Sequence, residues 1–370
     1  MPKKPSGGPR RVTMTDVARR AGVSQPTVSF VLNDRRDVAV AEETRRRVLE
    51  AAAELDFVPN RAAQLLRSNR SFTIGVVTSG IVSQPYAGLI VLGLQQVVQP
   101  AGYVCMVVDT TGDPGQGDDA VASLVAQGVA AIVYASLSPK PLHRSPRLDG
   151  IRTIFVNCWP EEGHADTVLL ADEYAGGRAA AASVFERGHR EVAFLGGMRN
   201  DYACKERRRG FDDAAREAGL RPADLVHRYG NYQIGSGYDL ATEVVVEHSS
   251  TALVCGNDRM AIGALLALHA LGLDCPDDVS IVGFDDQPDV ADQVRPGLTT
   301  AALPHLMLGR RAGELVLTAP EESPARETIP CNLIERDSVT TPPHHPTPRD
   351  AGAPPAAPTA PSRGRRGERK

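Results

Sequence analysis

The stretch TMTDVARRAGVSQPTVSFVLN at residues 13–33 carries the signals of two short helices joined by a tight turn. Thr13 and Asp16 have the spacing of a capping box, which opens a helix by satisfying its first backbone N–H groups. Gly22 can adopt the positive φ that a tight turn requires, and Ser24 can cap the helix that follows. Two short helices joined at a glycine predict a helix-turn-helix.

Residues 12–58 as a whole predict a head of three short helices, because apolar side chains recur at the helical period through residues 42–55. The inward-facing side chains of this third helix are expected to be Val48, Leu49 and Ala52. Residues 59–70 form a connector, in which residues 60–66 could make two helical turns. A helix of this length is marginally stable alone in water, and it therefore needs support from a partner.

From residue 71 the pattern changes to short apolar segments that alternate with helical stretches rich in Ala and Leu, such as residues 175–187 and 261–271. The strand candidates are Thr73–Val77, Tyr103–Val108, Ala130–Ala135, Thr153–Val156, Glu191–Leu195, Ala252–Cys255 and Val279–Val282. Such alternation is typical of a doubly wound parallel sheet. The pattern restarts after about residue 172, which predicts two similar α/β lobes within residues 71–338.

The net charge of −4 hides an uneven distribution. Residues 1–70 hold 14 Lys and Arg against 8 Asp and Glu, and residues 339–370 hold 6 against 2. The intervening residues 71–338 hold 21 against 35. A basic head on an acidic body suggests that the head meets a polyanion, although a solvated basic face gives the same pattern.

Both ends of the chain are expected to be disordered. Residues 1–11 are basic, and residues 339–370 contain eight prolines and close on RGRRGERK, a composition that cannot build a core. The arginine cluster of this tail could add non-specific attraction to DNA or act as a solubilising tail.

The composition indicates neither a membrane span nor a signal peptide, since no run of about 18 apolar residues occurs and no apolar segment follows residues 1–11. We therefore expect a cytoplasmic protein without a membrane partner. The six cysteines are scattered singly with no CxxC pair, which favours buried reduced thiols over a metal site or a disulfide framework. No metal and no cofactor are expected.

Several motifs at matching spacing resemble the lactose-repressor family, LacI/GalR. They are residues 13–24, 27–29, 31–33, 42–48 (EETRRRV), 57–63 (FVPNRAA), 187–197 (RGHREVAFLGG), 207–211 (RRRGF), 257–263 (NDRMAIG) and 279–286 (VSIVGFDD). They occur in the order of the family and cover roughly residues 12–338. Several independent motifs carry more weight than one short pattern.

The resemblance implies a homodimeric, sequence-specific DNA-binding regulator, expected to be a repressor, in three parts. A head at residues 12–58 reads one half of a palindromic operator in the major groove, and a hinge at residues 59–70 enters the minor groove. A core at residues 71–338, similar to periplasmic binding proteins, holds a small-molecule effector between two lobes. Lobe 1 is expected at about residues 71–168 and 301–327, and lobe 2 at about residues 169–300 and 328–338.

In this family the start of the second helix points at base edges. Gln25 is best placed to hydrogen-bond a base, and Gln suits adenine. Pro26 and Phe30 hold the other base-facing positions. Many members carry Arg where Phe30 stands, so this ring could contact a thymine methyl or pack against its neighbours. The side chains expected at phosphates are Ser24, Thr27, Ser29 and Asn33.

The hinge positions of the family match Asn60, Arg61, Ala63 and Leu66. Leu66 is expected to wedge between base pairs from the minor groove, as apolar side chains do in other DNA-bending proteins. An unstable hinge helix folds only when a partner helix and DNA support it, so the resemblance implies that movement of the lobes controls operator binding. Ala41 departs from the family, which often has a Ser cap there.

Seven residues match effector-binding positions of the family: Tyr86, Asn157, Arg207, Tyr232, Asn257, Asp285 and His305. Arg207 can fork onto two hydroxyls or a carboxylate, and Asp285 can accept from a sugar hydroxyl. Several of the seven follow predicted strands, at the end where open α/β sheets bind ligands. The mixture favours a polar neutral effector, with a sugar or sugar derivative first and a nucleoside- or purine-type ligand second.

Two other classes of protein explain less of the sequence. A dehydrogenase or another enzyme could share the doubly wound fold, but no GxGxxG follows the first strand candidate and no P-loop, HExxH or GxSxG occurs. No catalytic residue is therefore assigned. A secreted sugar-binding protein would explain the core but not residues 12–70.

Overall fold

The structure is a computed structural model that describes residues 12–32, 38–57, 71–81, 87–110, 114–161, 166–319 and 325–343. Its internal contacts divide the chain into two units, residues 1–72 and residues 73–370. Several expectations lie outside the described residues. They concern the two chain ends, Asn33, the hinge residues Asn60, Arg61, Ala63 and Leu66, and Tyr86.

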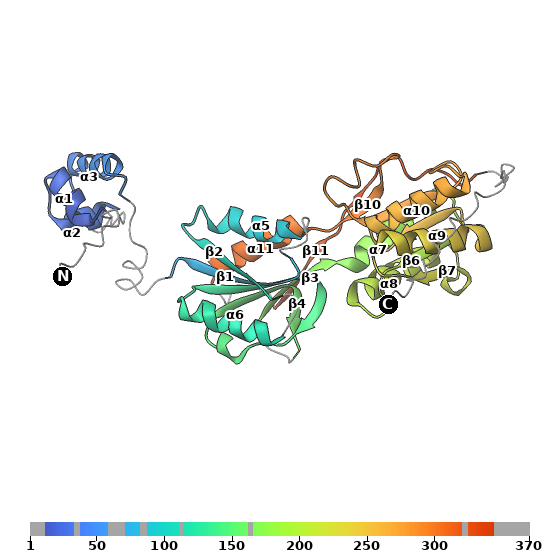
Figure 1. Cartoon of the computed structure of the whole chain (residues 1–370), viewed down its shortest axis with the longest axis horizontal. Helices are drawn as coiled ribbons and strands as arrows, with labels where there is room; N and C mark the ends of the chain where they lie inside the picture. The colour runs from blue at the N-terminus through green and yellow to red at the C-terminus, as the bar shows by residue number, and fades with distance from the viewer. Residues whose placement is uncertain are drawn as a thin grey trace, which may run out of the picture. The chain divides into compact units, whose positions relative to one another are not determined.

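The head forms α1 (Met14–Ala21), α2 (Gln25–Leu32) and α3 (Glu42–Glu54) within the described residues (Figure 1). The predicted capping box is confirmed, because the Thr13 hydroxyl accepts from the Asp16 N–H and the Asp16 carboxylate accepts from the Thr13 N–H at 3.0 Å. Gly22 follows α1 with φ 65°, and the Ser24 hydroxyl accepts from the Thr27 N–H at 3.3 Å. The turn between α1 and α2 therefore has the predicted glycine and the predicted cap.

The head helices enclose a small apolar core, which contains Val17, Ala18, Ala21, Val28, Val31, Val48, Ala51 and Ala52. The expectation that Leu49 faces inward is wrong, since its side chain is 49% exposed. Ala51 and Ala52 lie three and four residues after Val48 and share its face of α3. Leu49 lies about 100° around the helix from Val48, so it cannot share that face.

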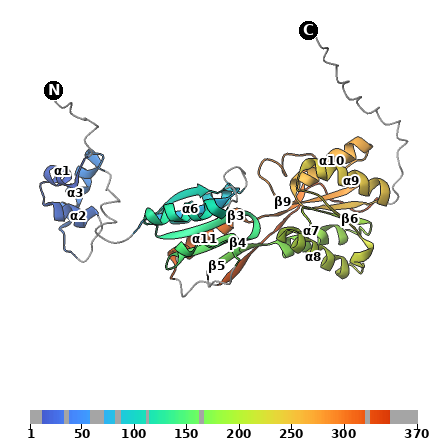
Figure 2. The same ribbon diagram turned by 60° about the horizontal axis from the view of Figure 1, so that its bottom comes forward.

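Lobe 1 is a parallel six-stranded sheet in the order β11-β5-β4-β3-β1-β2. Its strands are β1 (Thr73–Ser79), β2 (Val104–Asp109), β3 (Ala131–Leu142), β4 (Arg152–Pro160), β5 (Thr167–Asp172) and β11 (Arg326–Pro330). In Figures 1 and 2, α5 (Gly88–Val98) and α11 (His305–Leu317) cover one face and α6 (Pro114–Ala126) covers the other. A 3₁₀ turn, η1 (Pro146–Leu148), precedes β4.

Lobe 2 repeats this plan in the order β12-β10-β9-β8-β6-β7, with only the β10–β12 pair antiparallel. Its strands are β6 (Val192–Gly196), β7 (Val226–Tyr229), β8 (Ala252–Cys255), β9 (Ser280–Asp285), β10 (Thr299–Ala302) and β12 (Leu333–Ile334). As Figure 2 shows, α7 (Glu173–Phe185) and α8 (Tyr202–Glu217) cover one face, and α9 (Ile234–His248) and α10 (Asp258–Leu271) cover the other. A 3₁₀ turn, η2 (Pro222–Asp224), precedes β7.

The predicted doubly wound, two-lobed α/β core is therefore confirmed. The chain passes between the two sheets three times, after β5, after β10 and between β11 and β12. These crossings fall a few residues after the expected lobe boundaries, because β5 and β10 complete their own sheets before the chain leaves them.

The helices that cover each face approach one another through paired glycines. On the α7–α8 pair, a Cβ at Gly177 would overlap the backbone of Arg207, and a Cβ at Gly210 would overlap the backbone of Tyr174. Gly237 and Gly263 play the same part between α9 and α10, where the Cβ of Gly237 would meet the backbone of Met260. The close approach of α7 and α8 brings Arg207 of α8 next to Glu173 of α7.

Four of the six cysteines are buried and two are half-buried: Cys158, Cys204, Cys255 and Cys331 belong to the first group, Cys105 and Cys275 to the second. None of the helices in the described segments combines the length and the apolar character that a membrane span requires.

Candidate functional site

The N-terminal end of α2 presents the first group of predicted site residues. Ser24, Gln25 and Pro26 are exposed there, while Val28 and Val31 on the opposite face are buried in the head. The Ser24 hydroxyl also lies 2.8 Å from the Thr27 hydroxyl, so Ser24 caps α2 and at the same time stays at the surface. An exposed helix start with its polar side chains outward is the geometry that major-groove reading requires.

The remaining predicted residues of α2 are half-buried. They are Thr27, Ser29 and Phe30. Part of the Phe30 side chain therefore remains accessible. The partial burial is compatible with both interpretations of this ring, a contact with a thymine methyl and packing within the head.

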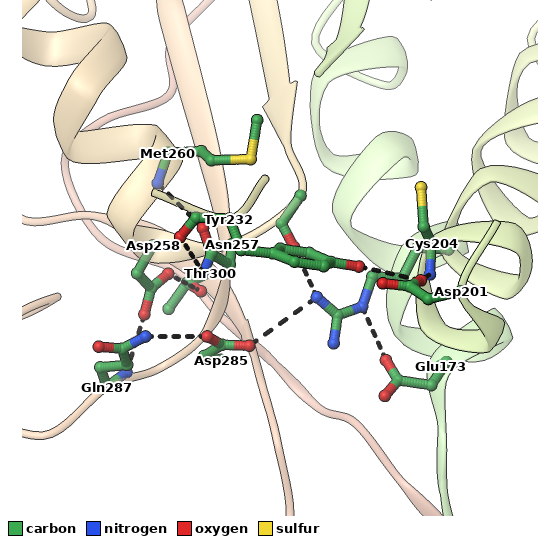
Figure 3. Close-up of polar contacts among 12 residues, drawn as sticks. Glu173, Asp201, Cys204, Tyr232, Asn257, Asp258, Met260, Asp285, Gln287 and Thr300 are labelled. Carbon is green, nitrogen blue, oxygen red and sulfur yellow. Dashed lines mark hydrogen bonds and ion pairs between the residues drawn. The ribbon is translucent and has the colours of Figure 1, made fainter. Parts of the chain in front are cut away.

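Several of the predicted effector-site residues gather near Arg207, in the second turn of α8. Figure 3 labels three of them, Tyr232, Asn257 and Asp285. The Arg207 Nε donates to the Glu173 carboxylate at 2.7 Å, and its Nη1 donates to the Gly256 carbonyl at 2.5 Å. An Asp285 carboxylate oxygen lies 3.8 Å from Nη1. The guanidinium also stacks over the Phe284 ring, with its carbon 3.6 Å from the ring centre. Four contacts, from α7, the turn after β8 and the end of β9, hold this side chain in place.

The charge of Arg207 is retained in spite of complete burial. Desolvation opposes the charged form, but the carboxylates of Glu173 and Asp285 raise the pKa of Arg207 above its usual value. The second amine nitrogen, Nη2, makes no hydrogen bond to any residue that the structure describes. An arginine has five N–H donors, so donors remain for a ligand.

Asp285 ends β9 in a strained conformation, with φ 113°, and it is buried. One of its oxygens accepts from the Gln287 side chain at 2.9 Å. The neighbouring Asp258 accepts from the Gln287 N–H at 2.8 Å and from the Thr300 hydroxyl at 2.6 Å. Burial raises the pKa of both carboxyls, and for Asp258 the charge of Asp285 raises it further.

Asn257 and Tyr232 form a second set of contacts in Figure 3. The Asn257 side-chain oxygen caps α10 by accepting from the Met260 N–H at 2.9 Å, and its nitrogen donates to the Tyr232 carbonyl at 3.2 Å. The Tyr232 hydroxyl donates to Asp201 at 3.2 Å. Burial raises the pKa of Tyr232, so this hydroxyl remains a donor. Asn257 is therefore a structural cap that also positions the tyrosine.

Two more predicted residues come from lobe 1. Asn157, in β4, is buried with φ 53°, and its side-chain oxygen accepts from the Ala171 N–H at 3.4 Å. His305 begins α11 and is 2% exposed. Burial, together with the charge of Arg207, lowers the pKa of His305 to about 4. The histidine is thus neutral at pH 7 and within electrostatic reach of Arg207.

Sequence reasoning missed the acids and amides that hold the predicted residues in place. These are Glu173, Asp201, Asp258 and Gln287. Glu173 follows the apolar segment TVLLAD, so recognising that segment as a strand would have placed the acid at a strand end. Asp201 carries the signal of a helix cap, since it precedes α8 and accepts from the Cys204 N–H at 2.6 Å.

One group of side chains in the described residues has the spacing of metal ligands. The ligand atoms of Glu243, Glu247 and His248 lie within 4.8 Å of one another. Arg228 already donates to Glu243 at 2.6 Å, and its Nη2 lies 2.9 Å from the His248 ring. Because the guanidinium supplies the positive charge there, this group does not argue for a metal site.

Comparisons with known families match both parts of the chain. A profile described as "Bacterial regulatory proteins, lacI family" matches residues 13–60, and a "Periplasmic binding protein-like domain" profile matches residues 181–339. The HTH-type transcriptional repressor PurR of Vibrio atlanticus is 30% identical over 335 residues, which cover 89% of this chain and 99% of the relative. The HTH-type transcriptional regulator GalR of Escherichia coli is 30% identical and covers 89% of this chain and 96% of its own.

Solved structures give the same result. The Lac repressor dimer bound to operator and the anti-inducer ONPF is 25% identical with a TM-score of 0.72, over 90% of this chain and all of that one. The CelR–cellobiose complex is 27% identical with a TM-score of 0.62, over 89% of this chain and all of that one. The matched relatives are transcriptional regulators, not enzymes. The chain therefore belongs to the LacI family of bacterial DNA-binding transcriptional repressors.

Proposed function

We propose that the chain represses transcription as a homodimer on a palindromic operator, and that a neutral, hydroxyl-rich small molecule bound at Arg207 controls this activity. The observation that carries the choice of ligand is the internal compensation of the Arg207 charge. Glu173 lies at 2.7 Å and Asp285 at 3.8 Å, so one buried cation faces two buried carboxylates. An anionic effector would add a further negative charge to this group and would be disfavoured.

The groups that remain available suit hydroxyls. Arg207 keeps donors at Nη2, and the Asp285 carboxylate has more acceptor capacity than its bond to Gln287 uses. Paired donors and acceptors of this kind can bind adjacent hydroxyls of a sugar, whereas an apolar ligand would leave them unsatisfied. A sugar or sugar derivative is therefore the first candidate, and the similarity to a cellobiose-bound regulator supports it.

A purine- or nucleoside-type effector is the second candidate. The relatives named PurR, at about 30% identity over nearly their whole length, are the observation that favours it. Such a ligand is also neutral, so the charge argument at Arg207 admits it.

For the DNA side of the proposal, Gln25 reads a base in the major groove and Leu66 enters the minor groove. Ser24, Thr27, Ser29 and Asn33 contact phosphates, and Pro26 and Phe30 line the base-reading surface. Asn60, Arg61 and Ala63 belong to the hinge. Effector binding changes the angle between the lobes and thus the separation of two hinges. A coupling free energy of about 1–3 kcal/mol would change operator affinity roughly 5- to 150-fold.

The effector proposal is tested by calorimetry on the full-length protein with cellobiose, neutral monosaccharides, hypoxanthine and adenosine. The informative variants are Asp285→Asn, which keeps size but removes charge, and Arg207→Lys, which keeps a cation beside Glu173 but loses the forked donors. Both should weaken binding at least about tenfold. Arg207→Ala would abolish binding too, but it would leave Glu173 buried without its partner and destabilise the fold. Equal binding by wild type and both variants would contradict the assignment.

The operator proposal is tested by selection of binding sites from randomised duplex DNA. We expect a palindrome, with Gln25→Ala relaxing the preference at one base pair in each half-site by about 1–3 kcal/mol. Leu66→Ala should weaken binding to all selected sites. Absence of any palindromic preference, or operator binding by Leu66→Ala as tight as wild type, would contradict the corresponding part.

A further inference from the structure

A cavity separate from the Arg207 site lies beside α8. It has a volume of about 310 Å³, within the range of small-molecule sites. Five cations line it, against the single carboxylate of Asp212: they are Arg199, Lys205, Arg208, Arg209 and Arg216. Clustered like charges repel one another, so this lining is favourable only when a negative charge compensates it.

Three of the five cations are already paired. Arg208 lies 3.4 Å from Asp212, Arg209 lies 2.6 Å from Glu206, and Arg216 pairs with Asp213. The other two differ. In the segments that the structure describes, neither Arg199 nor Lys205 forms an ion pair, and both are exposed at the mouth of the cavity. The cavity therefore has about two positive charges without an internal partner.

Tyr229 forms an aromatic wall of the same cavity. The Arg199 guanidinium lies 5.2 Å from the centre of its ring and that of Arg208 lies 6.0 Å away, while Arg208 also donates to the Tyr229 hydroxyl. The exposed amide of Asn200 completes the polar lining. A ring flanked by guanidinium groups offers a surface for a flat or ring-shaped body attached to an anion.

The RRR run at residues 207–209 serves both sites from one helix. Arg207 is buried and turned toward Glu173, whereas Arg208 and Arg209 line the cavity on the other side of α8. Successive residues of a helix differ by about 100° in direction, which accounts for the division. The two sites have opposite electrostatic character: buried carboxylates face Arg207, whereas cations outnumber carboxylates in the lining of the cavity.

We propose that this cavity binds a phosphate monoester, a phosphorylated small molecule whose ring rests against Tyr229. A phosphate monoester carries about two negative charges near neutral pH, which matches the two unpaired cations. It also presents three acceptor oxygens to the arginine, lysine and amide donors. A single carboxylate would leave one cation uncompensated. The site goes beyond the effector site proposed above and does not depend on it.

The test is isothermal titration calorimetry of the full-length protein, at low salt, with adenosine 5′-monophosphate, glucose 6-phosphate and inorganic phosphate. Adenosine and glucose, the unphosphorylated compounds, show how much of the binding comes from the Arg207 site, which is proposed to take neutral molecules. We expect at least one of the two esters to bind more tightly than inorganic phosphate. Arg199→Gln/Lys205→Gln should weaken that binding at least about tenfold, since charge-assisted hydrogen bonds are lost. Tyr229→Phe, which keeps the ring, should bind within a few-fold of wild type.

The matched control removes two exposed arginines elsewhere on lobe 2, Arg221→Gln/Arg295→Gln, and should leave ester binding unchanged. The proposal is overturned if no phosphate compound binds, if both double variants weaken binding equally, or if Asp285→Asn removes it while the cavity variant does not. Competition by a random 20-base-pair duplex through Arg199 and Lys205 would instead identify a nucleic-acid surface and would also overturn the proposal. Operator binding is not the readout, so failure here leaves the proposed function standing.

Discussion

His305 links the ionisation of the candidate site to the stability of the core. Burial and the nearby charge of Arg207 lower its folded pKa to about 4, against about 6.5 in an unfolded chain. Between these values the folded state binds fewer protons than the unfolded state. The contribution of neutral His305 to folding stability is therefore complete above about pH 6.5 and is lost as the pH falls toward 4.

We therefore expect His305→Gln to flatten the acid limb of the stability curve. Between pH 7 and pH 4.5, the free energy of core unfolding should fall less in the variant than in wild type, by up to about 3 kcal/mol. Urea unfolding across this range measures the difference. The comparison with wild type is essential, because the raised pKa values of Asp258 and Asp285 act in the opposite direction. His143→Gln, at an exposed histidine, is the control, and parallel curves for His305→Gln and wild type would contradict the prediction.

Motifs located residues of the site but not their partners. The family resemblance singled out Arg207, Tyr232, Asn257 and Asp285, and the structure brings these four together. It could not show that Glu173 neutralises Arg207. That contact joins residues 34 positions apart, and it depends on how closely α7 and α8 approach each other.

At the scale of elements, paired glycines set the spacing of the helices, and α9 offers a matched test. Gly237 faces α10, where a Cβ would meet the Met260 backbone, whereas Gly235, two residues earlier, has open space around it. Gly237→Ala should destabilise the core by about 1–3 kcal/mol through overpacking. Gly235→Ala should stabilise it by about 0.5–1 kcal/mol, because alanine is the better helix former. Thermal unfolding of the two variants measures both effects, and shifts of the same sign would contradict the argument.

The start of α3 offers a gain in stability. Ala41 stands at the cap position with φ −57° and ψ 139° and makes no side-chain hydrogen bond to the helix. Ala41→Ser adds a hydroxyl that can accept from the first free N–H groups, so the head should gain about 0.5–2 kcal/mol. Hydrogen exchange of the α3 amides reports on this gain locally, and unchanged exchange rates would count against it. Ala53→Ser, at an exposed position inside the helix, should give no such gain.

Seven strands could be predicted because each is a compact apolar run, and these became β1, β2, β3, β4, β6, β8 and β9. The five strands that were missed have physical reasons. β7 (VHRY) and β11 (RETIP) are edge strands with alternating or polar side chains, and β12 has only two residues. β10 is short and rich in threonine, and β5 continues directly into α7, so its apolar run merges with the helical pattern. Segments of this kind form strands because they pack against neighbouring strands, and the sequence of the segment alone does not show those neighbours.

On the scale of the whole core, an aromatic contact joins the two lobes beside the chain crossings. Trp159, at the end of β4, packs edge to face against Tyr202, the first residue of α8, with ring centres 5.2 Å apart. Arg326 of β11 donates to the Tyr202 hydroxyl at 3.3 Å, and its guanidinium lies 6.0 Å from the Trp159 ring. Tyr202 thus belongs to lobe 2 but packs against the apolar cluster of lobe 1. Any change in the angle between the lobes must alter this contact.

Trp159 is the only tryptophan in the chain, so its fluorescence should report the lobe angle directly. We expect a compound that changes operator affinity to change the emission of Trp159, and a compound without effect on operator affinity to leave it unchanged. In Tyr202→Leu the emission change should be much smaller. Emission that stays constant while an effector alters operator binding would show that the lobes do not rotate at this contact.

The sign of the same signal distinguishes two modes of regulation. In the proposed mechanism, operator and effector bias one conformational equilibrium, so their coupling is reciprocal. If the effector releases the operator, the two ligands favour opposite lobe arrangements, and they should shift Trp159 emission in opposite directions. If the effector tightens operator binding, both shifts should have the same sign. Titration of operator alone, of effector alone and of both together on the full-length protein therefore assigns induction or corepression from one residue.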